Sequence, residues 1–429
     1  MKKNYYPWIL MAVSLVTAVS LTGCGKSREA GGKEAQAGQL SEENQDKEGS
    51  DILETVELTV WGAEEDEELL KQIIDGFKET YQGQADFSIT YKPQGESGCK
   101  DALIADLEAG ADVFAFADDQ LNTLVAAGAL EPVEEGENLK TANIKEAVEA
   151  ASVGGTLYAY PLTADNGYFL YYNKEYFTQE DIKSLDRMLE IAEENGKVIS
   201  MDWSSAWYVY AFFGNTGLEV GLNEDGITNY CTWNGTDGAI KGTDVANSML
   251  RIAASPGFAS LNDEGFLKGV QDGSVIAGVS GVWNALAVEE AWEEGYGAAR
   301  LPSYTCAGEQ VQMASFSGYK LVGVNAYSKH YDWACRMAEW ITNQSNQELR
   351  FQMRGQGPSN KNAAASKAVQ QSPAIVALLE QSEFSKLQRI GGNFWTPVET
   401  FSKNMAAGNP DNGNLQELLD KMVEGVTAP

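Results

Sequence analysis

The chain has 429 residues, of which 43% are hydrophobic and 10% aromatic, and its formal net charge is −31. Apolar side chains are ample for a packed core, whereas the charge argues against nucleic acid or an anionic membrane surface as a partner, because both would repel the chain. His330 is the only histidine, which weakens the case for a Ser-His-Asp triad or a histidine-ligated zinc site. The sequence also lacks a GxxxxGKS or GxxxxGKT phosphate loop and a GxGxxG turn after a strand, so we expect no cofactor and no metal.

The N-terminus has the pattern of a bacterial lipoprotein signal. Lys2 and Lys3 precede an uncharged apolar stretch at residues 5–21, which ends in the sequence Leu-Thr-Gly followed by Cys24. Small residues before a cysteine resemble a lipobox, in which the thiol is acylated and the chain is cut just before it. We predict that residues 1–23 are a signal peptide and that Cys24 carries a lipid. The alternative is an uncleaved transmembrane anchor, and both alternatives place the body outside the cell membrane.

Residues 24–54 are predicted to form the lipid anchor and a disordered tether. From residue 25 to about residue 51 there are no aromatic residues, and Gly, Ser, Glu, Gln, Lys and Ala dominate. Such a segment cannot bury enough apolar surface to offset the entropy of ordering it. A flexible coil of about 25 residues would reach roughly 25–30 Å, so it would hold the body clear of the membrane.

The body begins with an alternation of strands and helices. Strands are predicted at residues 56–61, 87–91 and 111–116, with a helix after each of the first two. The first helix has apolar residues at helical spacing from Leu69 to Tyr81, and the second lies around residues 103–107. This order is typical of an α/β fold.

Further strands are predicted along the rest of the body. They lie at residues 155–161, 168–174, 274–279 and 319–324, and an amphipathic helix with Trp333 and Trp340 follows the last one. Four cysteines are scattered without CxxC or zinc spacing, namely Cys99, Cys231, Cys306 and Cys335. They are either free thiols or members of one or two disulfides.

Five segments, in a fixed order along the body, carry a family resemblance. They are Val60-Trp61 with its acidic turn, residues 112–120 followed by 130–132, residues 157–161 followed by 171–174, residues 278–283, and residues 317–324. The series resembles the extracellular solute-binding proteins of ABC importers, the type that includes maltodextrin-binding protein. The chain departs from the maltodextrin relatives at Gln120, Val282 and Ser317, where arginine, proline and glycine are usual. These departures count against a maltodextrin as the ligand.

The resemblance implies a two-lobed, periplasmic-binding-protein-like (type II) α/β fold with central mixed sheets, hinge strands and a ligand cleft between the lobes. Lobe 1 would comprise residues 55–164 and about 320–365, and lobe 2 about 165–319 and 366–429. Ligand binding would close the lobes by a hinge motion.

Candidate ligand-binding residues are acids and aromatics near the ends of predicted strands. A sugar needs carboxylates or amides for its hydroxyls and aromatic rings for its C–H faces. The candidates are Asp118, Asp119, Asp165, Trp283, Trp61, Trp207, Tyr208, Tyr319 and Trp395. For the Asp118-Asp119 pair the alternative is a helix cap, for Asp165 a solvated turn, and for the aromatics core packing.

The expected protein is a monomeric, lipid-anchored binding protein on the extracytoplasmic face of the membrane. It would capture a carbohydrate and deliver it to an ABC permease, without catalysing a reaction. Two alternatives remain open at this point. Acids beside aromatics also describe the clefts of glycoside hydrolases and lyases, and the same fold could serve a membrane-tethered ligand sensor.

Overall fold

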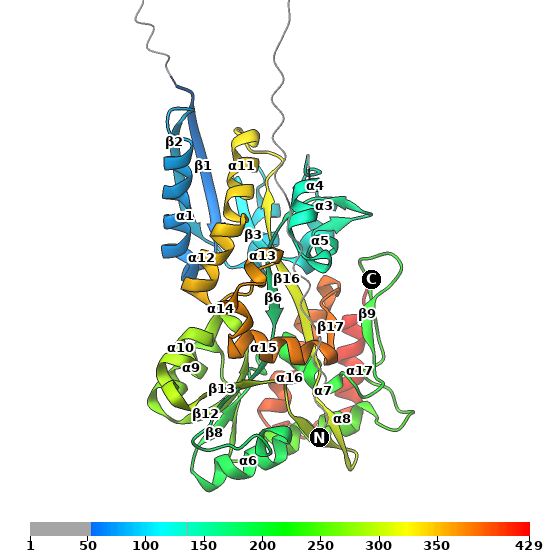
Figure 1. The fold of residues 1–429 in the computed structure, drawn as a ribbon. Helices are drawn as coiled ribbons and strands as arrows, with labels where there is room; N and C mark the ends of the chain where they lie inside the picture. The colour runs from blue at the N-terminus through cyan, green and yellow to red at the C-terminus, as the bar shows by residue number, and fades with distance from the viewer. Residues whose placement is uncertain (1–52, 135) are drawn as a thin grey trace, which may run out of the picture. The chain divides into compact units, whose positions relative to one another are not determined.

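The computed structural model describes residues 53–134 and 136–429, which are coloured in Figure 1. The predicted signal peptide and Cys24 lie outside the described residues. The α-helices are α1 (Glu67–Thr80), α2 (Cys99–Ala105), α3 (Leu121–Ala126), α4 (Glu137–Ala142), α5 (Lys145–Ala150), α6 (Leu185–Glu194), α7 (Ala206–Phe213), α8 (Gly242–Ala253), α9 (Asp263–Asp272), α10 (Ala285–Trp292), α11 (Tyr331–Ile341), α12 (Gln344–Arg354), α13 (Lys361–Ala364), α14 (Lys367–Gln370), α15 (Pro373–Gln381), α16 (Trp395–Ala406) and α17 (Leu415–Val426). Within the described ranges, no helix is both long and apolar enough to cross a bilayer.

The first sheet is mixed and contains the N-terminal strands of the body. Its spatial order is β17, β16, β3, β1 and β2, and β6 also pairs with β16. The bounds are β1 (Thr55–Gly62), β2 (Asp86–Pro93), β3 (Val113–Ala117), β6 (Tyr160–Gly167), β16 (Ser315–Val324) and β17 (Ser385–Leu387). β1 is parallel to β2 and β3, whereas β16 is antiparallel to β3 and β6 and parallel to β17.

The second sheet is also mixed, and its order is β11, β8, β12, β7 and β13. The bounds are β7 (Phe169–Asn173), β8 (Val198–Ser200), β11 (Phe258–Ala259), β12 (Val275–Ser280) and β13 (Tyr296–Ala299). Short two-stranded ribbons join β4 (Ser152–Val153) to β5 (Thr156–Leu157), β9 (Val220–Leu222) to β10 (Asn229–Cys231), and β14 (Ser303–Cys306) to β15 (Glu309–Gln312). The predicted α/β class with central mixed sheets is confirmed.

Helices cover both faces of the second sheet, which explains why every residue of β7 is buried. Alternate side chains of a strand point to opposite faces. Leu170 and Tyr172 accordingly pack in a cluster with α6, α7, α8, α16 and α17, whereas Phe169 and Tyr171 pack with α9, α10 and α15. The strand is therefore covered by helices on both of its faces.

Two neighbouring strands, β6 and β16, connect the two sheets. Residues 315–317 of β16 pair with β17, and residues 320–324 pair with β3. Phe316 packs in the large cluster of the second sheet, whereas Val322 and Val324 pack in the cluster of the first sheet. β6 runs beside β16 and leads directly into β7. Residues 318–320 of β16 thus lie where one core gives way to the other, a region that we call the strand crossing.

Most elements predicted from periodicity are confirmed. The strand expected at residues 155–161 is divided between β5 and the start of β6. The helix expected around residues 103–107 is α2, which begins earlier than expected and ends at Ala105. Asp106 adopts an extended conformation there, and its carboxylate accepts the backbone N–H of Ala109, which favours a turn over continued helix. The four cysteines of the body, which the sequence left open between thiols and disulfides, are all free.

Candidate ligand-binding site at the strand crossing

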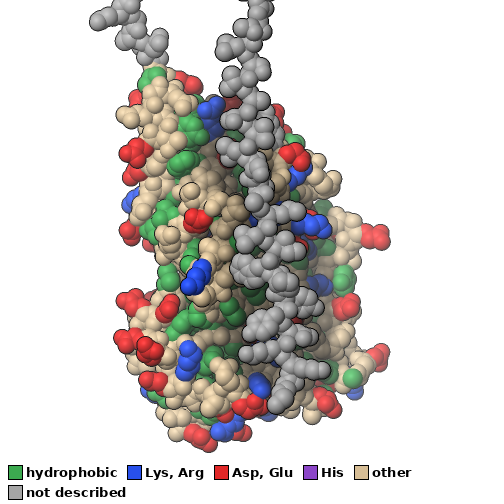
Figure 2. Space-filling view, viewed as in Figure 1, with side chains coloured by type: hydrophobic (Ala, Val, Ile, Leu, Met, Phe, Trp, Pro, Cys, Tyr) green, Lys and Arg blue, Asp and Glu red, His purple; other side chains and the backbone are tan. Residues whose placement is uncertain are grey.

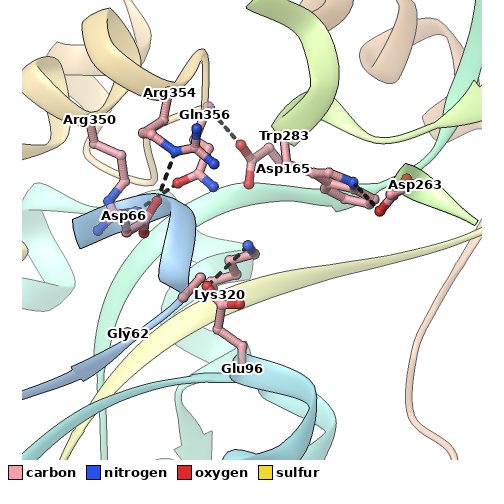
Figure 3. Close-up of polar contacts among 12 residues, drawn as sticks. Gly62, Asp66, Glu96, Asp165, Asp263, Trp283, Lys320, Arg350, Arg354 and Gln356 are labelled. Atoms are coloured by element: carbon pink, nitrogen blue, oxygen red, sulfur yellow. Dashed lines mark hydrogen bonds and ion pairs between the residues drawn. The ribbon is translucent and has the colours of Figure 1, made fainter. Parts of the chain in front are cut away.

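Lys320 is the last residue of the strand crossing, and Figure 3 shows its side chain beside Glu96. Its backbone pairs with Ala117 of β3 and Thr163 of β6, and its side chain is 11% exposed. The ammonium nitrogen lies 3.2 Å from Glu96 Oε1 and 6.0 Å from the ring centroid of Trp283. One cation from the connecting strand therefore approaches side chains that belong to both parts of the fold.

The charge on Lys320 is held by nearby carboxylates. Burial acts to lower the pKa of Lys320, but the negative charges of Glu96, Asp165 and Asp66 outweigh this effect and raise the pKa. The ammonium therefore stays protonated, and it acts as a hydrogen-bond donor only.

Gln120 holds the short helix η2 (Glu96–Gly98) that supplies Glu96. Its amide Nε2 donates to the carbonyl oxygens of Glu96 at 2.7 Å and Ser97 at 3.2 Å, and its Oε1 accepts the N–H of Lys100 at 2.9 Å. Gln120 thus serves as a structural support for this turn.

Asp165 is a buried carboxylate within β6, 2% exposed. One oxygen accepts the backbone N–H of Gly357, and the other has no hydrogen-bond partner. Burial raises the pKa of Asp165, against the opposing positive charges of Lys320 and Arg350. The alternative of a solvated turn residue is therefore wrong.

A second ion cluster joins α12 to the turn after β1. Asp66, in the 3-10 helix η1 (Glu64–Asp66), is 2% exposed and accepts hydrogen bonds from Arg350 and, at 2.9 Å, from Arg354 Nε. Arg350 also donates to Gln356 Oε1 at 2.7 Å. Burial acts to raise the pKa of Asp66, but Arg350, Lys320 and Arg354 outweigh it and lower the pKa, so the carboxylate is charged.

Asp118 and Asp119 follow β3 in the 3-10 helix η3 (Asp118–Gln120). Asp118 is 1% exposed, its Oδ1 accepts the N–H of Tyr319 at 2.9 Å, and its Oδ2 lies 4.0 Å from Arg389 Nε. Burial raises the pKa of Asp118 to about 6. Burial, with the charge of Asp118 added, raises the pKa of Asp119 to about 7. Neither side chain caps η3 or α3, so the alternative of a helix cap is wrong.

Aromatic side chains gather around Trp283 in the 3-10 helix η5 (Val282–Asn284), which follows β12. Trp283 is half-buried and stacks on Trp207 of α7, with centroids 5.6 Å apart and an interplanar angle of 25°. Trp207 in turn contacts Tyr168 edge-on at 5.1 Å and Tyr208 at 5.5 Å. The indole N–H of Trp283 donates to Asp263 Oδ2 at 3.0 Å.

The sequence model of the bacterial extracellular solute-binding proteins matches residues 72–377. This chain belongs to that family. The match includes β2, β3, β6, β7, β12 and β16, and so covers the whole strand crossing of this solute-binding protein.

Individual relatives agree with the family assignment. The chain is 23% identical to the galactooligosaccharide-binding protein of Bacillus subtilis (strain 168) over 421 residues, which are 95% of this chain and 93% of that protein. A solved structure described as a complex with acarbose is 29% identical, with a TM-score of 0.74 over 85% of this chain and 98% of the other. The maltotriose-binding protein of Thermus thermophilus, bound with maltotriose, is 20% identical, with a TM-score of 0.72 over 86% and 99%. The two-lobed fold is thereby confirmed.

The structure brings some of the predicted site residues of this solute-binding protein together. Asp165 and Trp283 both lie near Lys320, and Trp207 and Tyr208 pack around Trp283. Asp118 lies beside Gly318 and Tyr319 of β16.

The remaining predicted aromatics have different surroundings. Trp61 packs on the cluster of Phe114 and lines a small pocket with Asp66 and Arg350. The ring of Tyr319 packs partly on the same cluster. Trp395 begins α16, lies edge-on to Phe394 at 5.1 Å, and packs, partly buried, against the core of the second sheet.

Several polar residues at the site were missed by sequence reasoning. They are Lys320, Glu96, Asp66, Arg350, Asp263 and Arg389. Lys320 lay inside a predicted crossing strand, and a charged residue within an otherwise apolar strand is a signal that could have identified it. The other residues lie in turns and helices without a distinguishing local pattern.

Proposed function

We propose that this protein captures an uncharged carbohydrate at the strand crossing and delivers it to the permease of an ABC importer. The observation that carries the proposal is the half-buried indole of Trp283, 6.0 Å from the ammonium of Lys320, which lies among carboxylates. The part of this half-buried ring that remains accessible suits the C–H groups of a sugar, and the acids suit its hydroxyls. The relatives named for galactooligosaccharide and maltotriose binding support the same ligand class.

The charge balance of the site favours an uncharged ligand. Its cations are already close to acids, in the pairs Lys320–Glu96, Arg350–Asp66, Arg354–Asp66 and Arg389–Asp118. In the part of the chain that the structure describes, the buried carboxylate oxygens without a hydrogen-bond partner belong to Asp118, Asp119 and Asp165. Sugar hydroxyls can donate to such oxygens, whereas an anionic sugar would have to compete for a paired cation.

The overall charge of the protein also favours an uncharged ligand. The net charge of the chain is −31, and acidic side chains are spread around the face shown in Figure 2. A field of this sign disfavours the approach of anions and does not hinder a neutral oligosaccharide.

We further propose that the lobes divide as the sequence predicts, with residues 55–164 and about 320–365 in lobe 1 and about 165–319 and 366–429 in lobe 2. β6 and β16 would then be the hinge strands, and Lys320 would lie at the hinge. Ligand capture would close the lobes around the sugar.

The proposed setting is the outer face of the cell membrane. Residues 1–23 would be removed as a signal peptide, Cys24 would carry the lipid, and residues 24–54 would connect it to the body. A tether of about 30 residues keeps the effective concentration of the protein near a permease high. We propose that the protein is a monomer and has no catalytic activity, in keeping with relatives that are named as binding proteins.

A ligand screen tests the ligand class. Thermal unfolding of the body is measured with galactotriose, maltotriose, acarbose, trigalacturonate, amino acids and polyamines. A ligand at a hundredfold excess over its Kd should stabilise the protein by about 2.7 kcal/mol. Stabilisation by a neutral oligosaccharide without turnover over hours supports the proposal. Stabilisation by trigalacturonate, amino acids or polyamines alone, or measurable hydrolysis, refutes it.

Trp283→Ala tests the site. Binding of the neutral oligosaccharide should fall at least about a hundredfold, because the stacking surface is lost, while circular dichroism and unfolding remain those of a folded protein. Trp333→Ala is the matched control, since Trp333 is also half-buried but packs on Phe87 and Phe77, far along the first sheet. This control should lose stability and keep affinity. Wild-type affinity in Trp283→Ala would refute the assignment.

A further inference from the structure

Asp263 accepts three side-chain hydrogen bonds from the turn after β12. Its Oδ2 accepts the indole N–H of Trp283 at 3.0 Å, and its Oδ1 accepts Ser280 Oγ at 3.0 Å and Asn284 Nδ2 at 2.8 Å. Asn284 also donates to Ser280 Oγ at 2.9 Å. One carboxylate therefore holds the residues on both sides of the turn together with the indole. Figure 3 shows the bond between the indole of Trp283 and Asp263.

Helix capping does not account for the position of Asp263. The cap of α9 is Asn262, whose side chain accepts the backbone N–H of Gly265 at 2.9 Å. Asp263 is the first residue of the helix, and its carboxylate bonds to residues 280–284 instead of to the helix. The side chain of Asp263 is exposed, so water could have solvated the carboxylate in place of these bonds.

The backbone beneath the indole of Trp283 also fits the ring closely. A Cβ on Gly281 would lie 1.9 Å from a ring carbon of Trp283, so the ring rests directly on the glycine. The carbonyl oxygen of Gly281 accepts the hydroxyl of the buried Tyr171 at 2.8 Å, which fixes that peptide. Trp207 then covers the indole by stacking.

We propose that Asp263 is a positioning residue that sets the affinity for carbohydrate by holding the indole of Trp283 in a single orientation. The proposal rests on the proposed function for its effect on affinity. A free tryptophan side chain on a turn samples several rotamers, and ordering it on binding would cost entropy. Asp263 makes that ordering part of folding, so the ring is already in place when the sugar arrives.

The test is a double-mutant cycle of Asp263→Ala with Trp283→Phe, because phenylalanine keeps a ring but has no N–H for Asp263 to hold. Galactotriose and maltotriose are titrated by calorimetry. In the wild-type background Asp263→Ala should weaken binding about tenfold, and in the Trp283→Phe background by less than about twofold. Equal losses in the two backgrounds would overturn the proposal.

Two further variants separate positioning from charge and from folding defects. Asp263→Asn keeps an acceptor for the indole and should stay within about threefold of wild type. Glu264→Ala removes the neighbouring acid of the same helical turn, which is also exposed, and should leave affinity unchanged. A loss in Glu264→Ala as large as in Asp263→Ala would assign the effect to overall charge and overturn the proposal.

A readout without ligand distinguishes failure of this proposal from failure of the proposed function. The protein is labelled with 5-fluorotryptophan, and the fluorine resonance of Trp283 is identified by its loss in Trp283→Phe. In Asp263→Ala this resonance should shift or broaden, while those of the other tryptophans, apart from the stacked Trp207, keep their positions. An unchanged Trp283 resonance overturns the proposal, whether or not any sugar binds.

Discussion

The turn after β3 and the turn after β12 share one local structure but present opposite chemistry. In each, a buried strand runs into a 3-10 helix and then an α-helix, through η3 to α3 in the first sheet and through η5 to α10 in the second. The first turn carries Asp118, 1% exposed beneath Tyr319 and Arg389, whereas the second carries the half-buried Trp283. A glycine makes close contact with each functional side chain, Gly318 with Asp118 and Gly281 with Trp283.

The difference shows how the same backbone arrangement can hold either buried acids or a half-buried aromatic ring. At the first turn the carboxylates are buried, so folding raises their pKa and the free energy of unfolding depends on whether they are protonated. At the second turn the ring is half-buried and its partner Asp263 is exposed, so we expect changes there to act on ligand affinity more than on stability. Three measurements test this contrast.

The largest expected effect is a pH dependence of stability at the acidic turn. Burial raises the pKa of Asp119 in the folded chain to about 7, from an ordinary value of 3.8. The folded state therefore binds more protons than the unfolded state between these values, and stability falls as pH rises through that window. From about pH 5 to pH 8 the free energy of unfolding should fall about 2–3 kcal/mol further in wild type than in Asp119→Asn.

Urea unfolding at several pH values measures this difference. Asp411→Asn is the matched control, because Asp411 is exposed in the loop before α17, and its profile should follow that of wild type. Parallel plots of unfolding free energy against pH for wild type and Asp119→Asn would mean that Asp119 is not protonated near neutral pH. The two turns would then not differ in how their stability depends on pH.

The next effect concerns Gly318. A Cβ at this position would lie 2.7 Å from Asp118 Oδ1 and 3.2 Å from Asn166 Nδ2. Because Asp118 is buried and held by Tyr319, Gly318→Ala should destabilise the fold by about 2 kcal/mol. Gly392→Ala is the control, since a Cβ there would meet nothing within 4 Å, and it should change stability by less than about 0.5 kcal/mol. Equal unfolding midpoints for the two variants would contradict the prediction.

The smallest effect in free energy is expected at Gly281. Gly281→Ala must displace the indole of Trp283, but the half-buried ring can swing outward, so stability should change little. Calorimetry should show oligosaccharide affinity about tenfold weaker, which corresponds to about 1.4 kcal/mol. Unchanged affinity with a loss of stability would show that the second turn behaves like the first.

The fold and some residues of the candidate site could be predicted from the sequence. Strand periodicity located β1, β3, β7, β12 and β16, since each alternates or forms a short apolar run that a buried strand requires. Trp283 could be selected because a large aromatic after a glycine-containing turn at a strand end seldom belongs to a core. Asp165 was also selected, although its burial and its bond to Gly357 were not foreseen.

The ion pairs could not be predicted, for a physical reason. Glu96 and Lys320 are 224 positions apart, and Asp66 and Arg350 are 284 positions apart. Such pairs depend on the register of β16 against β3 and on the placement of α12 beside α1, which no local pattern encodes. The same holds for Asp263, which is 20 positions from Trp283 and belongs to a different element.

The contact between Gly281 and Trp283 also has a consequence for how this binding site can diversify. While residue 283 is a tryptophan, any side chain at residue 281 collides with it, and the acid at residue 263 has an indole to hold. Once residue 283 becomes small, both constraints disappear together. Among proteins descended from this one, residues 263, 281 and 283 should therefore be conserved together or change together. A protein with a different sugar preference should differ at all three positions.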